Sequence, residues 1–308
     1  MFEHWAHALA MLPMKDCRFS LPMMNRIASG EVHWFPKSNK ETDGVMQRIR
    51  AEGPLTPSDF DDKPSSKAMW ASSSSKMALE QLFIEGELMV PYRRKFQKVY
   101  DLRERVLLEG VDTSVPSETE LCQHLISSFL RAHGLGQLKE MSYLRKGMGP
   151  AMRSTAQQME EESTIVRLSI AGRDYYCEPE LLDTKPLRSS LRILSPFDNA
   201  IIQRDRANSM FDFDYQIECY AKKENRNYGY FCLPLLHRNR LIGRLDAKAE
   251  RKTSVLHLYH LQLEDSVKNV EEATSALKSE LIKFASFNGC KQLQLHRFSR
   301  PGRKPDWL

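Results

Sequence analysis

Hydrophobic positions in the first third of the chain recur with helical spacing. In residues 41–53, Val45 and Ile49 lie four positions apart, which predicts a short helix with one buried face. The segment GPLTPSDF predicts a second helix that starts at Thr56, because a capping threonine is followed by proline and, three positions on, by an acidic residue. Residues 75–88 group large apolar side chains on one face up to a stop at Gly86. Three helices are therefore expected before residue 90.

Two short strands, residues 87–90 and 97–102, are predicted next, joined by the segment PYRRKF. Three helices followed by a hairpin is the order of a winged helix, whose third helix can enter a major groove while the hairpin contacts phosphates. Arg93, Arg94 and Lys95 lie at the tip of this predicted wing. A tight turn requires only residues such as Gly, Asn or Asp, so the charge there favours phosphate contact. The alternative interpretation is a solvated loop.

The same order recurs between residues 114 and 188. Ser117 and Glu120 form a predicted capping box at the start of a helix that closes at Gly134. The segments QLKEMSYLRKG and GPAMRSTAQQMEEES can supply two more helices, and TIVRLSI alternates like a strand before the turn AGRD. We predict a second winged helix here, and its less basic hairpin indicates a scaffold role.

From residue 190 the hydrophobic period changes to two. The alternation is cleanest in FDFDYQIECY, residues 211–220, which predicts a half-buried strand. YGYFCLPLL, LIGRLDAK and VLHLYHLQLE predict further strands, so a small antiparallel sheet or barrel is the simplest assembly. A helix from about Val267 to Phe287 is expected to cover it.

The predicted fold class is α+β, with tandem winged helices followed by a C-terminal antiparallel, barrel-like β-rich domain and a terminal helix. Residues 1–35 contain an aromatic and histidine cluster but no clear start to a fold, so they are interpreted as the remnant of an N-terminal helical or winged-helix module. Residues 36–110 and 111–188 are the two predicted winged helices, and residues 189–308 are the β-rich domain.

Positive charge is concentrated in one segment of the chain, although the net charge of the whole chain is small. The 308 residues contain 45 Lys and Arg against 40 Asp and Glu, and a net charge of +5 is too mild to identify nucleic acid as a partner. Between residues 222 and 252, however, nine cations face three acidic residues, with Tyr228, Tyr230 and Phe231 among them. This concentration favours a polyanion, although the same charges could simply solvate a sheet edge. The candidate contacts there are Arg238, Arg240, Arg244 and Lys248.

Several classes of protein are disfavoured. No apolar stretch approaches the roughly 20 residues of a membrane-spanning helix, and the N-terminus lacks the basic region of a signal peptide, so we expect a cytoplasmic protein with no membrane partner. Six scattered cysteines form no C-x-x-C pair and no metal spacing, which indicates reduced core thiols and no metal or cofactor. No triad motif, P-loop or G-x-G-x-x-G occurs. A lone cysteine nucleophile remains an open alternative.

One family shares many strings with this chain. The strings are FEHWAHALAMLP, GPLTPSDF, ALEQLFIEGELMV, FQKVYDLRERV, SPFDNAIIQRDRA, FDFDYQIECY, YGYFCLPLLHRNRLIGRLDAKAERK and FASF, in order from residue 2 to about 287. Together they resemble the YcaQ-like winged-helix DNA glycosylases, a bacterial family. The resemblance implies tandem winged helices with a C-terminal β-rich domain. It also implies excision of bulky alkylated guanines, including interstrand crosslinks, from duplex DNA without a metal.

The chain departs from this family at the catalytic motif. In the family, the segment that resembles Trp5 to His7 follows a further winged helix with a Gln-apolar-Asp or Gln-apolar-Gln motif, and this sequence starts after it. We therefore expect the chemical step to be absent, in a shortened gene model or a degenerate paralogue. QIE at 216–218 and QLQ at 292–294 match by spacing alone and are rejected as catalytic, because both lie in strand-like C-terminal segments.

The resemblance also bears on DNA contacts. It places Trp5 and His7 near a damaged base, although core packing is an equal alternative for Trp5. MWASSSSK keeps Trp70 and Lys76 of a Trp-rich, Lys-containing family stretch but replaces other large residues with serine, which weakens stacking and phosphate contact. Lys76 is thus a further candidate contact. Two other functions stay open, a non-catalytic winged-helix transcriptional regulator and a protein-interaction scaffold.

Overall fold

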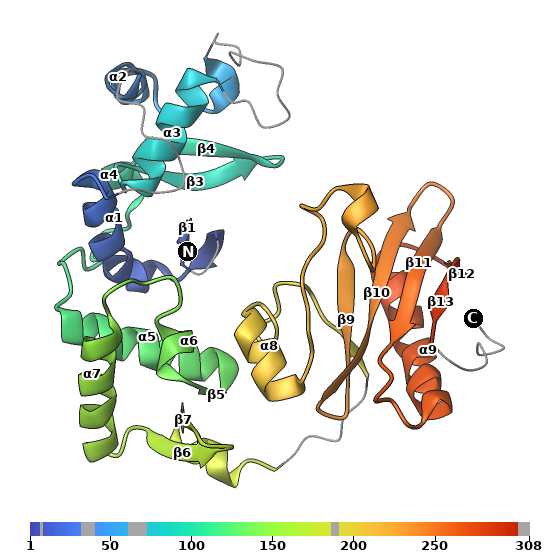
Figure 1. The fold of residues 1–308 in the computed structure, drawn as a ribbon. Coiled ribbons are helices and arrows are strands. Elements are labelled where there is room, and N and C mark those ends of the chain that lie inside the picture. The colour runs from blue at the N-terminus through green and yellow to red at the C-terminus, as the bar shows by residue number, and fades with distance from the viewer. Residues whose placement is uncertain (7–8, 32–40, 61–72, 186–190, 301–308) are drawn as a thin grey trace. The chain divides into compact units, whose positions relative to one another are not determined.

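The computed structural model describes residues 1–6, 9–31, 41–60, 73–185 and 191–300 (Figure 1). The chain divides into two compact units. Unit 1 comprises residues 1–129 and 137–169, and unit 2 comprises residues 130–136 and 170–308. The four-part division expected from the sequence is finer than this, and its boundaries stay a prediction.

Residues near the N-terminus form ordered elements that the sequence pattern did not predict. Strands β1 (Phe2–Trp5) and β2 (Leu9–Leu12) pair as an antiparallel hairpin, followed by the 3-10 helix η1 (Met14–Ser20) and by α1 (Leu21–Ala28). Phe2 is buried in a small cluster with Cys17 and Met89. Glu3 and His4 on the same strand are also buried, so β1 lacks the alternation by which a half-buried strand is recognised.

The elements between residues 41 and 102 match the predicted order with one difference. They are α2 (Thr42–Glu52), the 3-10 helix η2 (Pro57–Asp59), α3 (Ser74–Ile84), β3 (Leu88–Arg94) and β4 (Gln97–Leu102). The second predicted helix is a single 3-10 turn, because its capping box forms but the backbone is extended again at Phe60. A bridge between Leu55 and Tyr100 adds a further pairing to β4.

A half-buried carboxylate fixes α3 to strand β4. Glu80 on α3 accepts hydrogen bonds from Lys98 Nζ, at 2.8 and 3.0 Å, and from Tyr100 Oη, at 2.7 Å. The Lys98 ammonium also lies 4.2 Å from the ring centroid of Phe83, which belongs to the core of α2, α3 and the hairpin. Burial, and then the charge of Glu80, raises the pKa of Tyr100 far above its ordinary range, so the phenol stays a donor.

Residues 103–183 contain the predicted second series of helices and a hairpin. The elements are α4 (Arg103–Val106), α5 (Glu118–His133), β5 (Leu135–Gly136), α6 (Leu138–Met141), α7 (Gly149–Glu161), β6 (Val166–Ile170), β7 (Arg173–Cys177) and the 3-10 helix η3 (Pro179–Asp183). Strand β5 pairs antiparallel with β7. The helix expected over QLKEMSYLRKG is only one turn, at α6.

Unit 2 is built on a mixed sheet. Its elements are β8 (Arg192–Ile193), α8 (Arg204–Phe211), the 3-10 helix η4 (Lys223–Asn225), β9 (Cys232–His237), β10 (Arg240–Glu250), β11 (Val255–Leu263), α9 (Val270–Phe287), β12 (Gln292–Leu295) and β13 (Phe298–Ser299). The sheet order is β12-β11-β10-β9-β8, and β13 also pairs with β11.

The prediction of an antiparallel sheet is right for β8 to β11 and wrong for the last strands. Both β12 and β13 run parallel to β11. The reason is that α9 returns the chain to the start of β11, as a helical crossover between parallel strands does. Figure 1 shows α9 alongside this part of the sheet. Its residues Leu277 and Leu281 are fully buried with Leu256, Leu258 and Leu261 of β11.

The strand predicted over residues 211–220 is also wrong. Helix α8 ends at Phe211, Asp212 is left-handed with φ +51°, and the following residues pair with no strand that the structure describes. Burial nevertheless alternates, because Phe213 and Tyr215 enter a cluster with Cys232 and Leu241. Tyr215 Oη donates to the Cys232 carbonyl at 2.6 Å. The period of two here reflects packing, without a ladder of main-chain hydrogen bonds.

All six cysteines are free thiols, five of them buried and Cys219 half-buried. Burial raises the pKa of Cys232 to about 12, which leaves little thiolate at neutral pH. Within the described residues, no group of three or more His, Cys, Asp or Glu side chains could hold a metal ion. No helix in the described ranges is long and apolar enough to cross a membrane.

Replacing Glu80 tests its role in holding α3 to the hairpin. Glu80→Gln keeps the side-chain shape but leaves the mostly buried Lys98 without its counter-charge, so we expect a loss of about 1–3 kcal/mol in unfolding free energy. Urea denaturation of the full chain measures it. The control Glu52→Gln breaks the more exposed pair with Arg48 and should cost less than Glu80→Gln. Equal losses would contradict a special role for Glu80.

Candidate nucleic-acid interface

The β3–β4 hairpin projects beyond α3 and ends in a two-residue turn (Figure 1). Arg94 pairs with Gln97, and Lys95 and Phe96 form the turn, with Lys95 in the left-handed region at φ +60°. Arg93 and Arg94 therefore belong to the last part of a strand, whereas the sequence placed them in the loop. The strands continue to the tip, which fixes the directions of the side chains around it.

Arg93 is bound by other groups of unit 1, although its side chain is 40% exposed. Its guanidinium makes a two-pronged ion pair with Glu3, with Nε 3.0 Å from Oε2 and Nη2 against Oε1, and the Glu3 side chain is only 5% exposed. Its third nitrogen, Nη1, donates to the carbonyl of Phe96 at 2.8 Å. Arg93 thus connects the turn to strand β1. The fork of a guanidinium suits this bidentate geometry.

The remaining tip residues face solvent. Arg94 and Lys95 are exposed, and the Phe96 side chain is 94% exposed. Burying such a ring on folding would be favourable, so an exposed aromatic at a rigid tip is a candidate contact for a partner. Phe96 is not among the contact residues predicted from the sequence. Its position at the predicted turn, where Gly or Asn is the usual residue, could have marked Phe96 as a candidate contact.

The other candidates in unit 1 have different surroundings. Lys76 is exposed on the first turn of α3, next to the cap Ser73. Trp5 is half-buried and packs against the cluster formed by α2, α3 and the hairpin, as the alternative interpretation expected. His7 and Trp70 lie outside the described residues.

The cations of unit 2 are spread along the β9–β11 sheet. Arg238 lies in the β9–β10 turn, ion-paired with Glu272, and Arg240 begins β10. Lys248 is exposed near the other end of β10, so roughly 26 Å of strand separates it from Arg240 at the usual rise per residue. The charge surplus that the sequence shows in one segment is therefore not one compact patch.

Arg244 is corrected from a surface contact to a core residue. Only 4% of it is exposed. Its guanidinium lies 4.5 Å from the ring centroid of Phe213 and 4.1 Å from that of Tyr228, and Nη2 is paired with Glu264 at 2.9 Å. A guanidinium sandwiched between two rings cannot reach a phosphate without opening the core.

Two carboxylates organise the loop before β9. Glu218, which is buried, accepts hydrogen bonds from the main-chain N–H groups of Asn227, Tyr228 and Gly229 at 2.9 to 3.0 Å. Burial alone would raise the pKa of Glu218, but these three donors outweigh it and the pKa lies below its ordinary value. Asp246 accepts from the next amides, Tyr230 N at 3.1 Å and Phe231 N at 3.4 Å.

The same loop requires glycine at residue 229. Gly229 has φ +156°, and a Cβ atom there would lie 2.2 Å from Asp246 Oδ2. The close approach lets one carboxylate reach consecutive amides. We call residues 218–231 the acid-pinned loop.

QIE at 216–218 and QLQ at 292–294 match the family's catalytic motif by spacing alone, and neither has the geometry of a group that activates water. Both oxygens of Glu218 are occupied by backbone amides, which explains its presence without a catalytic role. Gln292 and Gln294 are exposed on strand β12, which pairs with β11. Gln294 lies in register with His257 of β11, but the two ring nitrogens of His257 are already engaged, with Nε2 3.2 Å from Glu250 Oε2 and Nδ1 3.1 Å from His296 Nε2.

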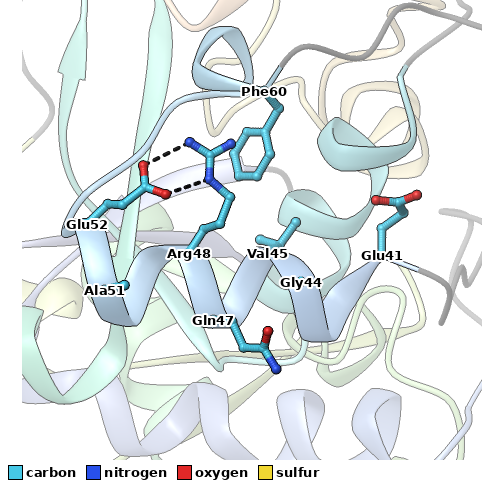
Figure 2. Close-up of a pocket in the computed structure, with 8 residues that line it drawn as sticks. All are labelled: Glu41, Gly44, Val45, Gln47, Arg48, Ala51, Glu52 and Phe60. Carbon is cyan, nitrogen blue, oxygen red and sulfur yellow. Dashed lines mark hydrogen bonds and ion pairs between the residues drawn. The ribbon is translucent and has the colours of Figure 1, made fainter.

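A shallow hollow on α2 is lined by an ion pair and an aromatic ring (Figure 2). Its volume is about 480 Å³, and it is lined by Arg48, Glu52 and Phe60 among others. Glu52 accepts two hydrogen bonds from Arg48, at 2.7 and 2.8 Å, and the guanidinium lies 4.5 Å from the Phe60 ring centroid. These contacts satisfy Arg48, so we assign the hollow no catalytic role.

Comparison with known proteins places the chain. The model of the family described as DNA glycosylase AlkZ-like matches residues 1–287. The chain belongs to the AlkZ-like DNA glycosylase family. This confirms the family resemblance drawn from the sequence strings. Among solved structures, DNA glycosylase AlkZ of Streptomyces sahachiroi is similar in fold to this AlkZ-like chain, with a TM-score of 0.61 and 15% sequence identity, covering 96% of this chain and 81% of AlkZ.

Glu218 provides a pH-dependent test of the acid-pinned loop. Its depressed pKa means that its stabilisation is complete above the ordinary glutamate pKa of about 4.3 and is lost as the pH falls through the lower folded-state value. Glu218→Gln should therefore cost about 1–3 kcal/mol at pH 7. Denaturation from pH 7 to pH 3 should show the difference from wild type shrinking in acid. The exposed Glu224→Gln is the control, and a constant difference at every pH would argue against the carboxylate.

Proposed function

We propose that this chain binds duplex DNA that contains bulky N7-alkylguanines or interstrand crosslinks, as a winged-helix repair protein of the cytoplasm. The observation that carries this proposal is the clamped β3–β4 hairpin, which presents Arg94, Lys95 and the exposed ring of Phe96 together. Membership of a DNA glycosylase family makes DNA the expected polyanion.

The arrangement around the hairpin supports a winged-helix docking mode. The order α2, η2, α3, β3 and β4 is that of a winged helix, with α3 as the groove-facing helix and Lys76 exposed at its start. Arg94 and Lys95 would contact backbone phosphates. Phe96 would insert at a groove, where apolar wedges unstack base steps and bend the duplex. A crosslinked or alkylated step is already distorted, so the wedge costs less there.

We further propose that residues 1–308 bind without hydrolysing the N-glycosidic bond. Hydrolysis needs a carboxylate or amide that positions water while positive charge develops on the sugar. In QIE at 216–218, both carboxylate oxygens of Glu218 already accept hydrogen bonds from backbone amides. In QLQ at 292–294, both glutamines lie exposed on β12. Two further Gln-apolar-Glu runs, QME at 158–160 and QLE at 262–264, have their glutamates in ion pairs, Glu160 with Arg167 at 3.3 Å and Glu264 with Arg244 at 2.9 Å.

Salt dependence tests the phosphate contacts at the hairpin tip. Arg94→Gln with Lys95→Gln should weaken duplex binding and reduce the slope of log affinity against log salt by about 2, since each lost phosphate contact removes about 0.9. Fluorescence anisotropy of a labelled duplex at several salt concentrations measures this slope.

Two companion variants sharpen that result. Lys283→Gln with Lys291→Gln removes the same charge from the end of α9 and its following residues, and should leave the slope unchanged. Phe96→Ala should weaken binding without altering the slope, because a ring releases no counterions. An identical loss in both double variants would mean that net charge, and not the hairpin, determines affinity.

A glycosylase assay tests the proposal that the chain does not hydrolyse the N-glycosidic bond. Purified chain is incubated with duplex containing one N7-alkylguanine, and abasic sites are measured by strand cleavage in alkali. We expect tighter binding to the alkylated duplex than to its undamaged twin, and no abasic sites above background. Abasic-site formation would overturn the non-catalytic part of the proposal. Preference for a specific undamaged sequence would instead favour a transcriptional regulator.

A further inference from the structure

The acid-pinned loop displays aromatic and cationic side chains that duplex binding by the hairpin does not use. Tyr230 is 56% exposed and Tyr220 is 80% exposed. Lys222 and Lys223, which lie between these two tyrosines in the sequence, are exposed as well. These side chains lie in unit 2, and the proposed duplex contacts of the hairpin lie in unit 1.

The loop is built as a rigid support. Five consecutive amides, residues 227–231, donate to the carboxylates of Glu218 and Asp246. The Tyr228 carbonyl accepts from His260 Nδ1 at 2.9 Å, which fixes the protonated nitrogen of that ring. Burial lowers the pKa of His260, so the imidazole stays neutral in this position. A loop with so many fixed amides loses little conformational freedom when it binds a ligand.

Arg226 orients the Tyr230 ring from one side. Its Nε donates to the carbonyls of Glu218 and Ala221, at 3.2 and 3.0 Å, and its guanidinium lies 4.8 Å from the Tyr230 ring centroid. Because the cation covers one side of a ring that is more than half exposed, the exposed surface lies away from Arg226. The result is a flat aromatic surface backed by a positive charge.

The chemistry of this surface fits an unpaired nucleobase. Every base has a π-face that stacks on tyrosine, and a cation behind the ring strengthens the attraction to an anionic strand. Lys222 and Lys223 can contact the phosphates on either side of that base. Glu224 is the exposed acid of the loop, so the two lysines outnumber it. A protein partner with an acidic surface would use the lysines but would not need the exposed ring.

We propose that the acid-pinned loop is a binding site for an unpaired nucleotide of DNA, in which the base stacks on Tyr230 and Lys222 and Lys223 contact the adjoining phosphates. The inference rests on the proposed function, because it assumes DNA as the partner. It adds a preference for strands with an extruded or unpaired base over fully paired duplex. Damage that disrupts pairing would present such a base.

The test compares three labelled DNAs by anisotropy: a fully paired duplex, the same duplex with one unpaired thymine, and a 15-nucleotide single strand. Wild type should bind the bulged duplex about tenfold tighter than the paired one, within the range of one base stacking on an aromatic ring. Tyr230→Ala should lose most of this preference while binding to the paired duplex is unchanged. Tyr230→Phe should retain it, because the ring is kept.

A crosslinking readout locates the contact. With 5-iodouracil as the unpaired base, irradiation should join the base to Tyr230, identified by mass spectrometry of the digested chain. Phe287→Ala removes an exposed ring at the end of α9 and should change neither readout. Equal melting temperatures of the variants check that the loop remains folded.

The outcomes separate the two proposals. Equal affinity for bulged and paired duplex, or a preference that survives Tyr230→Ala, overturns the unpaired-nucleotide site but leaves duplex binding standing. Binding to the bulged duplex and the single strand without affinity for the paired duplex supports the loop site and rejects the duplex proposal. Absence of binding to all three DNAs overturns both.

Discussion

The ion pair between Arg93 and Glu3 is the contact on which the proposed interface depends. A two-stranded hairpin is only marginally stable by itself, and a tip that moves freely contributes little to binding. Here β3 and β4 are tied at three places: to β1 through Glu3, to α3 through Glu80, and to the chain before η2 through Leu55. Because Arg93 also bonds the Phe96 carbonyl, the tie extends into the turn itself. The tip is therefore held by side-chain bonds in addition to the pairing of its two strands.

Unit 2 uses its acids in a similar way. Glu218 and Asp246 are directed at main-chain amides, and Glu264 is paired with the buried Arg244. Acids held in these contacts are not available to pair with the exposed Lys222 and Lys248, although the whole chain is only mildly basic. Net charge is thus a poor guide to the potential near a loop, because buried acids are counted in it but act locally.

Sequence periodicity predicted the type of element well where a regular helix or strand both forms the backbone hydrogen bonds and turns one face toward the core. Helices α2, α3 and α9 and the β3–β4 hairpin follow that pattern. It failed at residues 211–220, where Phe213 and Tyr215 alternate into a core without a strand partner, and at β1, where Glu3 and His4 are both buried. Among the candidate site residues, Lys95 lies in the predicted turn, whereas Arg93 and Arg94 belong to strand β3. The core role of Arg244 was missed, because proximity in sequence on an extended hairpin does not show which side chains point inward.

The two proposed contact surfaces combine the same groups in different proportions. At the hairpin tip, Arg94 and Lys95 flank one ring on a projecting turn, which suits an intact groove bordered by phosphates. In the acid-pinned loop, a fixed ring backed by Arg226 is the main feature, which suits a base that has left its stack. A crosslinked or alkylated site offers both features, since the strands stay joined while stacking is disturbed. A protein that used both proposed surfaces would gain selectivity for damage, because undamaged duplex satisfies the first surface only.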